Sequence, residues 1–345
     1  GWSFFNEQRA ESQSAVEGCG REFFVPYFVR VGNCVTGCFI TADSQPSPSV
    51  CTLAKRIMSA IVMSDSHARL ADRFAGMVHI TAGFEPRPNI QHVVFDFDGT
   101  LSLVREGWPE VMVPMFEELL PEAEGDTSES VRQMLLDDIM TLNGKQTIYQ
   151  MIRFAERVAD RGGTPEDPLE YKHEYLRRLE KRINSRVAGL QRGEVSPNQY
   201  LLHGSLDLLN ALKSRGMQLY LASGTDEVYV KREAKLLGVA EYFGKHIHGA
   251  LDNYKNFSKR QVIDRILKKN QVSGEQLLIF GDGYVEIEDC KNVGGLAVAV
   301  ASDEANNGSG EFDEWKRNRL LGVGADIVIP DYRDAELLLN VIEGK

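Results

Sequence analysis

An apolar run that ends in two carboxylates constrains the fold of this chain more than any other feature. Residues 92–97 read as a buried strand, and Asp96-Phe97-Asp98-Gly99-Thr100 places both aspartates at its end, just before a glycine turn. Alternate side chains of a strand share a face, so Asp96 and Asp98 can face one reaction centre while Phe97 points into the core. In open α/β sheets, chemistry gathers at such strand ends. The alternative is an ordinary strand exit, because Asp and Gly are common in turns.

Three further polar clusters follow in order, each at the end of an apolar run or at the start of a helical pattern. They are Ser223-Gly224-Thr225 after residues 217–222, Lys259 at the start of a helical pattern that extends to Asn270, and Gly281-Asp282-Gly283 with Glu286 after residues 277–280. A lone Ser-Gly-Thr or a lone lysine is a weak signal. The four clusters together favour a catalytic role for the first.

These residue types suit phosphoryl transfer. A carboxylate that attacks a phosphate dianion meets like-charge repulsion, so a divalent cation and fixed donors must hold the transferring oxygens. Asp96 and Asp282 are the hard oxygen ligands that Mg²⁺ prefers. The Ser223 hydroxyl and the backbone N–H of Gly224 can bind the phosphate, and Lys259 can supply a compact positive charge.

The order of the clusters resembles the haloacid dehalogenase superfamily of phosphohydrolases, whose motifs are DxDGT, a strand-ending Ser or Thr, a Lys, and GDGxxD. The likeness extends over residues 92–300. It implies that Asp96 takes the phosphoryl group as a covalent intermediate, with Mg²⁺ as cofactor. Asp98 would protonate the leaving oxygen and later activate water. The predicted metal ligands are Asp96, Asp98 and Asp282, with Glu286 as a further ligand through water.

Two of these assignments have alternatives. Lys255 and Lys259 both precede the Gly-Asp-Gly loop, and the capping-box pattern of Ser258 and Gln261 favours Lys259 by placing it in the first turn of a helix. Glu286 stands where the resemblance implies Asp. Its alternative role is that of a helix-starting Glu that complements the helix dipole.

The chain between the first two clusters is far longer than one crossover helix requires. Its apolar spacing predicts helices, and its position resembles the helical cap of relatives of phosphoglycolate phosphatase and β-phosphoglucomutase. We therefore predict an α/β fold: a Rossmann-like, doubly wound parallel sheet with an inserted α-helical cap. The expected division is an N-terminal extension (1–90) without assigned function, a core domain (91–108 and 200–345) and a cap domain (109–199).

A lid of this kind excludes water and contacts the non-reacting part of the substrate. The candidates for setting specificity in the cap and in the loop after the first motif are Arg105, Trp108, Asn143, Lys145 and Gln146. For each of them, a solvated or core-packing role is the favoured alternative.

The net charge and the composition limit the kinds of binding partner that we expect. The net charge of −11 disfavours nucleic-acid backbones and anionic membranes, and no apolar run is long enough to span a bilayer. The five cysteines lack a second Cys or His pair at metal-binding spacing, so we expect reduced thiols and a cytoplasmic protein. The sequence leaves the oligomeric state open.

The leading functional prediction is a Mg²⁺-dependent phosphatase that hydrolyses a small phosphorylated metabolite through an aspartyl-phosphate. A phosphomutase would use the same residues but return the phosphoryl group to the substrate. A non-catalytic metabolite-binding regulator on the same fold is the third possibility.

Overall fold

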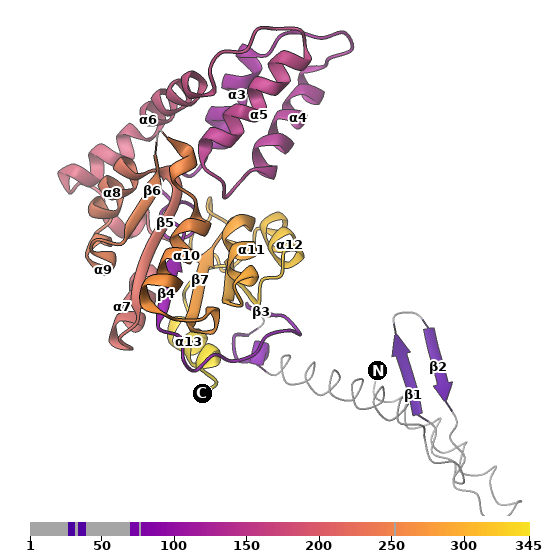
Figure 1. Cartoon of the computed structure of the whole chain (residues 1–345), viewed down its shortest axis with the longest axis vertical. Helices are drawn as coiled ribbons and strands as arrows, with labels where there is room; N and C mark the ends of the chain where they lie inside the picture. Colours follow the sequence, from indigo (N-terminus) through magenta and orange to yellow (C-terminus); the bar gives the residue numbers. More distant parts are fainter. Residues whose placement is uncertain (1–26, 32–33, 39–69, 76, 252) are drawn as a thin grey trace, which may run out of the picture. The chain divides into compact units, whose positions relative to one another are not determined.

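The computed structural model describes residues 27–31, 34–38, 70–75, 77–251 and 253–345. The chain divides into two compact units, residues 1–63 and 64–345. In the first unit, β1 (Tyr27–Val31) and β2 (Cys34–Cys38) form an antiparallel pair. The second unit carries all four of the predicted clusters, so its architecture positions the candidate site (Figure 1).

A seven-stranded sheet forms the centre of the second unit. Its strands are β3 (His79–Ile80), β4 (His92–Phe95), β5 (Gln218–Asp226), β6 (Ile247–Ala250), β7 (Leu277–Gly281), β8 (Leu296–Val300) and β9 (Ile327–Ile329). Their order is β3-β9-β8-β7-β4-β5-β6. All neighbours are parallel except β3 and β9, which are antiparallel. The predicted α/β class with a mostly parallel sheet is confirmed.

Helices cover both faces of this sheet, which explains why its strands are continuous apolar runs rather than alternating ones. Val93 and Phe95 of β4 pack in one core cluster and Val94 packs in another, as the period of two requires. The first cluster includes residues of α7 (Ser205–Ser214), α8 (Glu227–Leu236) and α13 (Ala335–Glu343); the second includes residues of α10 (Lys259–Asn270), α11 (Tyr284–Asn292) and α12 (Glu314–Gly322). The doubly wound arrangement is therefore confirmed.

Shorter helical segments complete the core. They are α9 (Ala240–Phe243) and the 3₁₀ turns η1 (Pro197–Gln199), η2 (Tyr254–Asn256) and η3 (Gly274–Gln276).

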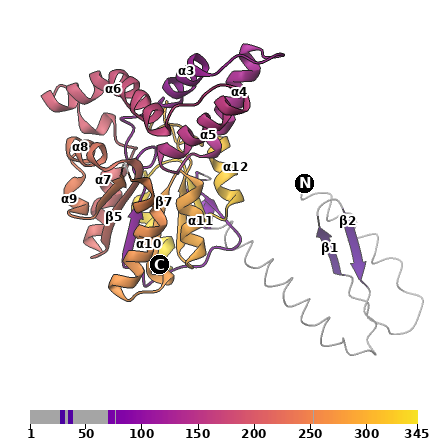
Figure 2. The same cartoon turned by 45° about the horizontal axis from the view of Figure 1, so that its top comes forward.

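Four helices lie between β4 and α7 in the chain: α3 (Pro109–Leu119), α4 (Ser128–Thr141), α5 (Thr147–Asp160) and α6 (Pro168–Arg192). Figures 1 and 2 show α3, α4 and α5 grouped together away from the sheet, and α6 reaches from this group to α8. Phe116 of α3 stacks on Phe154 of α5 with ring centroids 4.0 Å apart. The Asp167 side chain accepts from the Leu169 N–H and caps α6. The insertion is thus helical, as the sequence pattern predicts.

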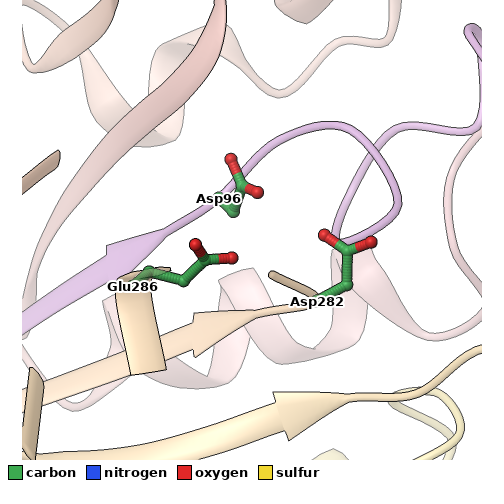
Figure 3. Close-up of side chains that lie close together, drawn as sticks. All are labelled: Asp96, Asp282 and Glu286. Atoms are coloured by element: carbon green, nitrogen blue, oxygen red, sulfur yellow. The ribbon is translucent and has the colours of Figure 1, made fainter. Parts of the chain in front are cut away.

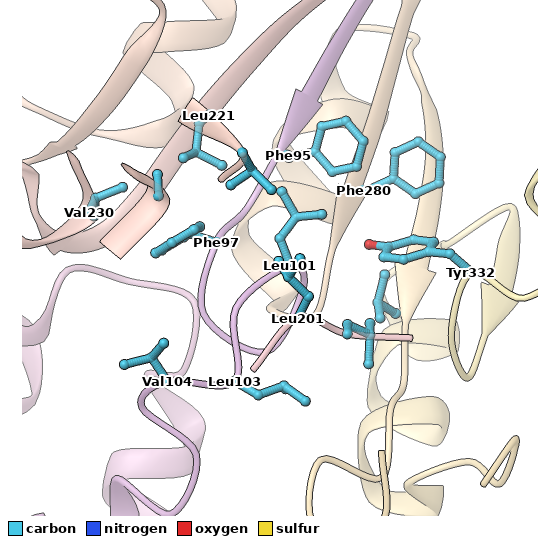
Figure 4. Close-up of a cluster of buried hydrophobic side chains, with 14 of the residues drawn as sticks. Phe95, Phe97, Leu101, Leu103, Val104, Leu201, Leu221, Val230, Phe280 and Tyr332 are labelled. Atoms are coloured by element: carbon cyan, nitrogen blue, oxygen red, sulfur yellow. The ribbon is translucent and has the colours of Figure 1, made fainter. Parts of the chain in front are cut away.

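The loop after β4 is anchored in the apolar core (Figure 4). Phe97 and Leu101 are fully buried, as expected for Phe97. The Tyr332 hydroxyl donates to the Thr100 carbonyl at 2.9 Å, and its ring packs edge-on against Phe280. These contacts fix the backbone on which Asp96 and Asp98 stand.

Some residues of the predicted N-terminal extension belong to the core. β3 pairs with β9, and Phe74 and Phe84 are buried in the same cluster as β4. Cys19 and Cys51 lie outside the described residues, whereas Cys290 is buried in α11 as a free thiol. Among the described residues, no helix combines the length and the apolar character that crossing a membrane requires.

Candidate active site

The order of the strands brings the sequence clusters together. β4 pairs with β5 on one side and with β7 on the other, so successive connections leave it in opposite directions. Such a switch point opens a crevice at the C-terminal ends of the strands. A cavity of about 80 Å³ lies there, and its lining includes Asp96, Asp98, Ser223, Gly224, Lys259 and Asp282. Six predicted residues from separate parts of the chain thus share one cavity.

Three carboxylates form a candidate metal centre. One oxygen each from Asp96, Asp282 and Glu286 can be chosen so that all lie within 4.8 Å of one another (Figure 3). Asp96 follows β4, Asp282 follows β7, and Glu286 lies in the first turn of α11. The Asp98 side chain does not belong to this group.

Lys259 links two of these carboxylates. Its Nζ lies 2.8 Å from Asp96 Oδ2 and 2.9 Å from Glu286 Oε2, and only 6% of the lysine is exposed. Burial opposes its charge, but the two carboxylates raise the pKa of Lys259 above its ordinary value. Lys255 is exposed in η2 and does not line the cavity. The Ser258 hydroxyl accepts from the Gln261 N–H and starts the helix at Lys259, as that half of the capping pattern predicts.

Glu286 combines both roles that the sequence left open. Its Oε1 accepts from the Gly283 backbone N–H at 2.7 Å, so it caps the start of α11. Its Oε2 contacts Lys259, and the side chain belongs to the carboxylate group. The added methylene relative to Asp lets one side chain cap the helix and reach the site.

One carboxylate oxygen of Asp98 accepts hydrogen bonds, and the other lies within ion-pair distance of Arg105. Its Oδ2 accepts from the hydroxyls of Thr225 at 2.8 Å and Ser223 at 3.3 Å, both in β5. Its Oδ1 is buried and accepts no hydrogen bond from any described residue, and Arg105 Nε lies 3.8 Å away. Burial raises the pKa of Asp98 to about 7. A carboxyl group with this pKa can both give and take a proton near neutrality.

Two charged residues next to Asp282, the buried Lys316 and the partly buried Glu304, have no counterpart in the sequence prediction. Lys316 of α12 contacts Asp282 Oδ2 at 3.1 Å and Glu304 Oε1 at 2.5 Å. Gly99, with φ +74°, passes so close that a Cβ there would lie 2.3 Å from Asp282 Oδ2. Nothing in the sequence distinguishes Lys316 from a solvated helix lysine. Glu304 lies in an acidic, Gly-rich stretch that reads as a surface loop.

Arg105 is the second feature that the sequence did not resolve. It forms a bidentate pair with the fully buried Glu233 of α8, at 3.0 and 2.8 Å. Tyr175 of α6 lines the same cavity and is also buried. Arg105 is therefore neutralised by the core while facing the cavity, a role that its sequence position did not indicate.

The loop between α4 and α5 lies against the Ser223-Gly224-Thr225 cluster. Asn143 and Lys145 line the cavity. A Cβ on Gly224 would lie 2.6 Å from the Lys145 carbonyl oxygen, so only glycine allows this approach. Gln146 instead donates to the carbonyls of Tyr254 and Phe257 at 3.0 and 2.7 Å. Gln146 thus has the structural role that was the alternative to substrate contact: it joins the loop to the core by hydrogen bonds.

The donor set fits a hard divalent cation. Within the described part of the chain, Lys259 pairs with both Asp96 and Glu286, and Lys316 pairs with both Asp282 and Glu304. The cation nearest Asp98 is Arg105, which Glu233 already neutralises. Burial and neighbouring carboxylates raise the pKa values of both Asp96 and Glu286, which indicates that negative charge is in excess. Carboxylate oxygens are the ligands that Mg²⁺ prefers. The carboxylate group contains three of the predicted ligands, Asp96, Asp282 and Glu286, but not the predicted ligand Asp98.

Residues 90–294 match the family described as "Hydrolase: haloacid dehalogenase-like hydrolase". This match confirms the resemblance predicted from the four motifs. No curated protein sequence matches the chain.

Several solved structures are similar in fold. A putative β-phosphoglucomutase from Bacteroides vulgatus is 15% identical, over 83% of this chain and 100% of that chain, with a TM-score of 0.49. A predicted phosphoglycolate phosphatase from Haemophilus somnus 129pt is 15% identical, over 74% and 97%, with a TM-score of 0.48. A haloacid dehalogenase-like hydrolase from Streptococcus pneumoniae is 19% identical, over 73% and 98%, with a TM-score of 0.46. At such low sequence identities and TM-scores, these similarities support no conclusion about activity.

Proposed function

Because this chain belongs to the haloacid dehalogenase-like hydrolases, we propose that it is a Mg²⁺-dependent phosphatase that acts on a small phosphorylated metabolite. The observation that supports this most strongly is the convergence of Asp96, Asp98, Ser223, Lys259 and Asp282 on one cavity. A nucleophile, a proton donor, an anion-binding hydroxyl and a fixed cation are the groups that phosphoryl transfer requires.

In the first half-reaction, a carboxylate oxygen of Asp96 attacks phosphorus while the bond from phosphorus to the substrate's alcohol oxygen breaks. Asp98 gives its proton to that oxygen, so a neutral alcohol leaves and an aspartyl-phosphate remains. The raised pKa of Asp98, about 7, supports this role because the side chain keeps a proton to donate near neutrality.

In the second half-reaction, Asp98, now ionised, takes a proton from water as the water oxygen attacks phosphorus. The bond from phosphorus to Asp96 breaks, inorganic phosphate leaves, and both side chains regain their starting states. The Thr225 hydroxyl holds Asp98 in one orientation through both steps, which leaves the single Ser223 proton for a phosphate oxygen when substrate is bound.

The remaining residues of the site would bind the phosphate and the metal ion. Ser223, the Gly224 N–H and Lys259 would hold the phosphate oxygens. Asp96, Asp282 and Glu286 would hold Mg²⁺, which when bound neutralises charge on the transferring phosphoryl group. Asp98 lies outside this carboxylate group, so the proposal keeps it for proton transfer.

We further propose that residues 109–199 form the cap that excludes water and selects the substrate. The contact of the Lys145 carbonyl with Gly224 supports this placement. Trp108, Asn143 and Lys145 line the cavity and are the proposed specificity residues, whereas Gln146 is a structural contact.

The experiment is an assay of inorganic phosphate released from p-nitrophenyl phosphate, with Mg²⁺ and with excess EDTA. Phosphate release that requires Mg²⁺ and is lost in Asp96→Asn supports the proposal. A screen of sugar, glycolate and nucleotide monophosphates then identifies the substrate. Transfer between sugar positions without phosphate release would instead establish a mutase, and tight metabolite binding without turnover would establish a regulator.

A further inference from the structure

A second cavity lies at the opposite end of the strands that carry the candidate active site. Its volume is about 430 Å³. His92 and Gln218, the first residues of β4 and β5, line it, whereas Asp96 follows the last residue of β4. At about 3.3 Å per residue, the four steps from His92 to Asp96 separate the two sites by about 13 Å along the strand.

The lining of this cavity is positively charged. It includes the cations Lys245, Arg265 and Lys269 and the histidines His92, His246 and His248, and it includes no Asp or Glu. The chain as a whole is acidic, with 50 Asp and Glu against 39 Lys and Arg. Within the described part of the chain, none of the three cations forms an ion pair. Their charge is therefore available to a ligand.

The floor of the cavity is ordered by ring contacts and hydrogen bonds. The buried Tyr220 ring lies 4.7 Å from the His246 ring and 5.9 Å from the His92 ring, measured between centroids. Its hydroxyl is 3.2 Å from His92 Nδ1, and Asn270 Nδ2 donates to it at 3.4 Å. Rings held in this way can present N–H groups to a ligand without reorganising.

Cations that line the cavity lower the pKa values of His246 and His248. Burial, Lys245 and Lys269 lower the pKa of His246. Burial and Arg265 lower the pKa of His248, against the opposing effect of Glu227 on α8. Because these lysines, the arginine and the rings all line the same cavity, they can act together on one bound group.

We propose that this cavity is a second ligand site, which binds a small polyanion that carries phosphate groups. Its volume falls within the range of about 300–1,000 Å³ that is usual for small-molecule sites. An Arg and two Lys side chains match a diphosphate-like charge, and neutral imidazoles can donate hydrogen bonds to its oxygens. Because the site lies at the far end of the sheet, it is separate from the phosphoryl-transfer site and does not depend on that activity.

The test uses inorganic pyrophosphate as the probe and the full-length protein without added divalent metal. The readout is the Cε1–Hε1 NMR signals of the histidines, assigned with His246→Gln and His248→Gln. We expect saturable shifts of the His246 and His248 signals. His173 and His203, which are exposed and do not line the cavity, should stay unchanged.

Charge variants show whether the effect is local. Lys269→Gln and Arg265→Gln should each weaken pyrophosphate binding by about fivefold. Lys268→Gln is the matched control, since Lys268 is an exposed lysine of the same helix that does not line the cavity, and it should leave binding unchanged. Circular dichroism confirms that each variant is folded.

Two results would overturn the proposal. The first is a set of shifts that KCl reproduces at the same ionic strength. The second is an equal loss of binding in Lys268→Gln and Lys269→Gln, because general surface charge would then explain the effect.

Discussion

Lys259 Nζ lies 2.8 Å from Asp96 Oδ2, and both side chains are buried. The same ammonium contacts Glu286 Oε2 at 2.9 Å. One lysine therefore holds together two carboxylates that would otherwise repel each other in a medium of low dielectric. Its contribution to stability and to activity can be measured separately.

Lys259→Met should abolish turnover and lower the free energy of unfolding by about 3 kcal/mol, because it leaves two buried carboxylates without their cation. Lys255→Met is the matched control: Lys255 is exposed four residues earlier, and its loss should change neither quantity. Urea denaturation and phosphate release measure the two effects. Equal activity of the two variants would mean that the wrong lysine has been assigned.

Asp98→Asn should slow turnover of alkyl phosphates by about 10²- to 10⁴-fold, because the amide cannot protonate the leaving oxygen or activate water. p-Nitrophenolate leaves without protonation, so formation of the aspartyl-phosphate from p-nitrophenyl phosphate should be less impaired in single-turnover experiments. Mg²⁺ affinity, measured by calorimetry, should be retained, since Asp98 lies outside the carboxylate group. Loss of metal binding would show that Asp98 is a ligand instead.

The raised pKa of Asp98 gives the pH dependence a definite sign. Burial favours the protonated form, and the pKa of about 7 means that the acid needed for the first step is present below pH 7 and is lost as the pH rises through 7. For an alkyl phosphate, kcat/KM should therefore decline on the alkaline side. For p-nitrophenyl phosphate the decline should be weaker. Identical alkaline limbs for both esters would rule out Asp98 as the acid.

Gly224→Ala should lower kcat/KM by at least about tenfold, because the new methyl group would lie 2.6 Å from the Lys145 carbonyl oxygen and would push the loop between α4 and α5 away from residues 223–225. Gly322→Ala is the control, since a Cβ there meets nothing within 4 Å. Steady-state kinetics with both variants measures the difference. A fully active Gly224→Ala enzyme would show that this contact is not needed for catalysis.

Much of this arrangement could be predicted because local patterns specify it. The run ending at Phe97 combines an apolar strand with carboxylates at its end, and the first and fourth motifs place Asp96 and Asp282 at the ends of β4 and β7. Helix starts were also predictable, since the Ser258 cap fixes α10 at Lys259. These features depend on residues close together in the chain.

Features that depend on long-range packing could not be predicted. Arg105 and Glu233 are 128 residues apart, and neither stands in a recognisable motif. Lys316 reaches Asp282 only because α12 packs beside β8, and its sequence surroundings are those of a surface helix. β3 was missed because two residues are too few for a strand pattern, and only its pairing with β9 defines it.

The most direct test of the account is to trap the phosphorylated enzyme. The protein is mixed with p-nitrophenyl phosphate and Mg²⁺, quenched in acid and treated with borohydride, which reduces an aspartyl-phosphate to homoserine. Peptide mass spectrometry should find homoserine at position 96 in the wild-type protein and nowhere in Asp96→Asn. Rapid turnover with no modified residue, or with the modification at another carboxylate, would contradict the proposed nucleophile.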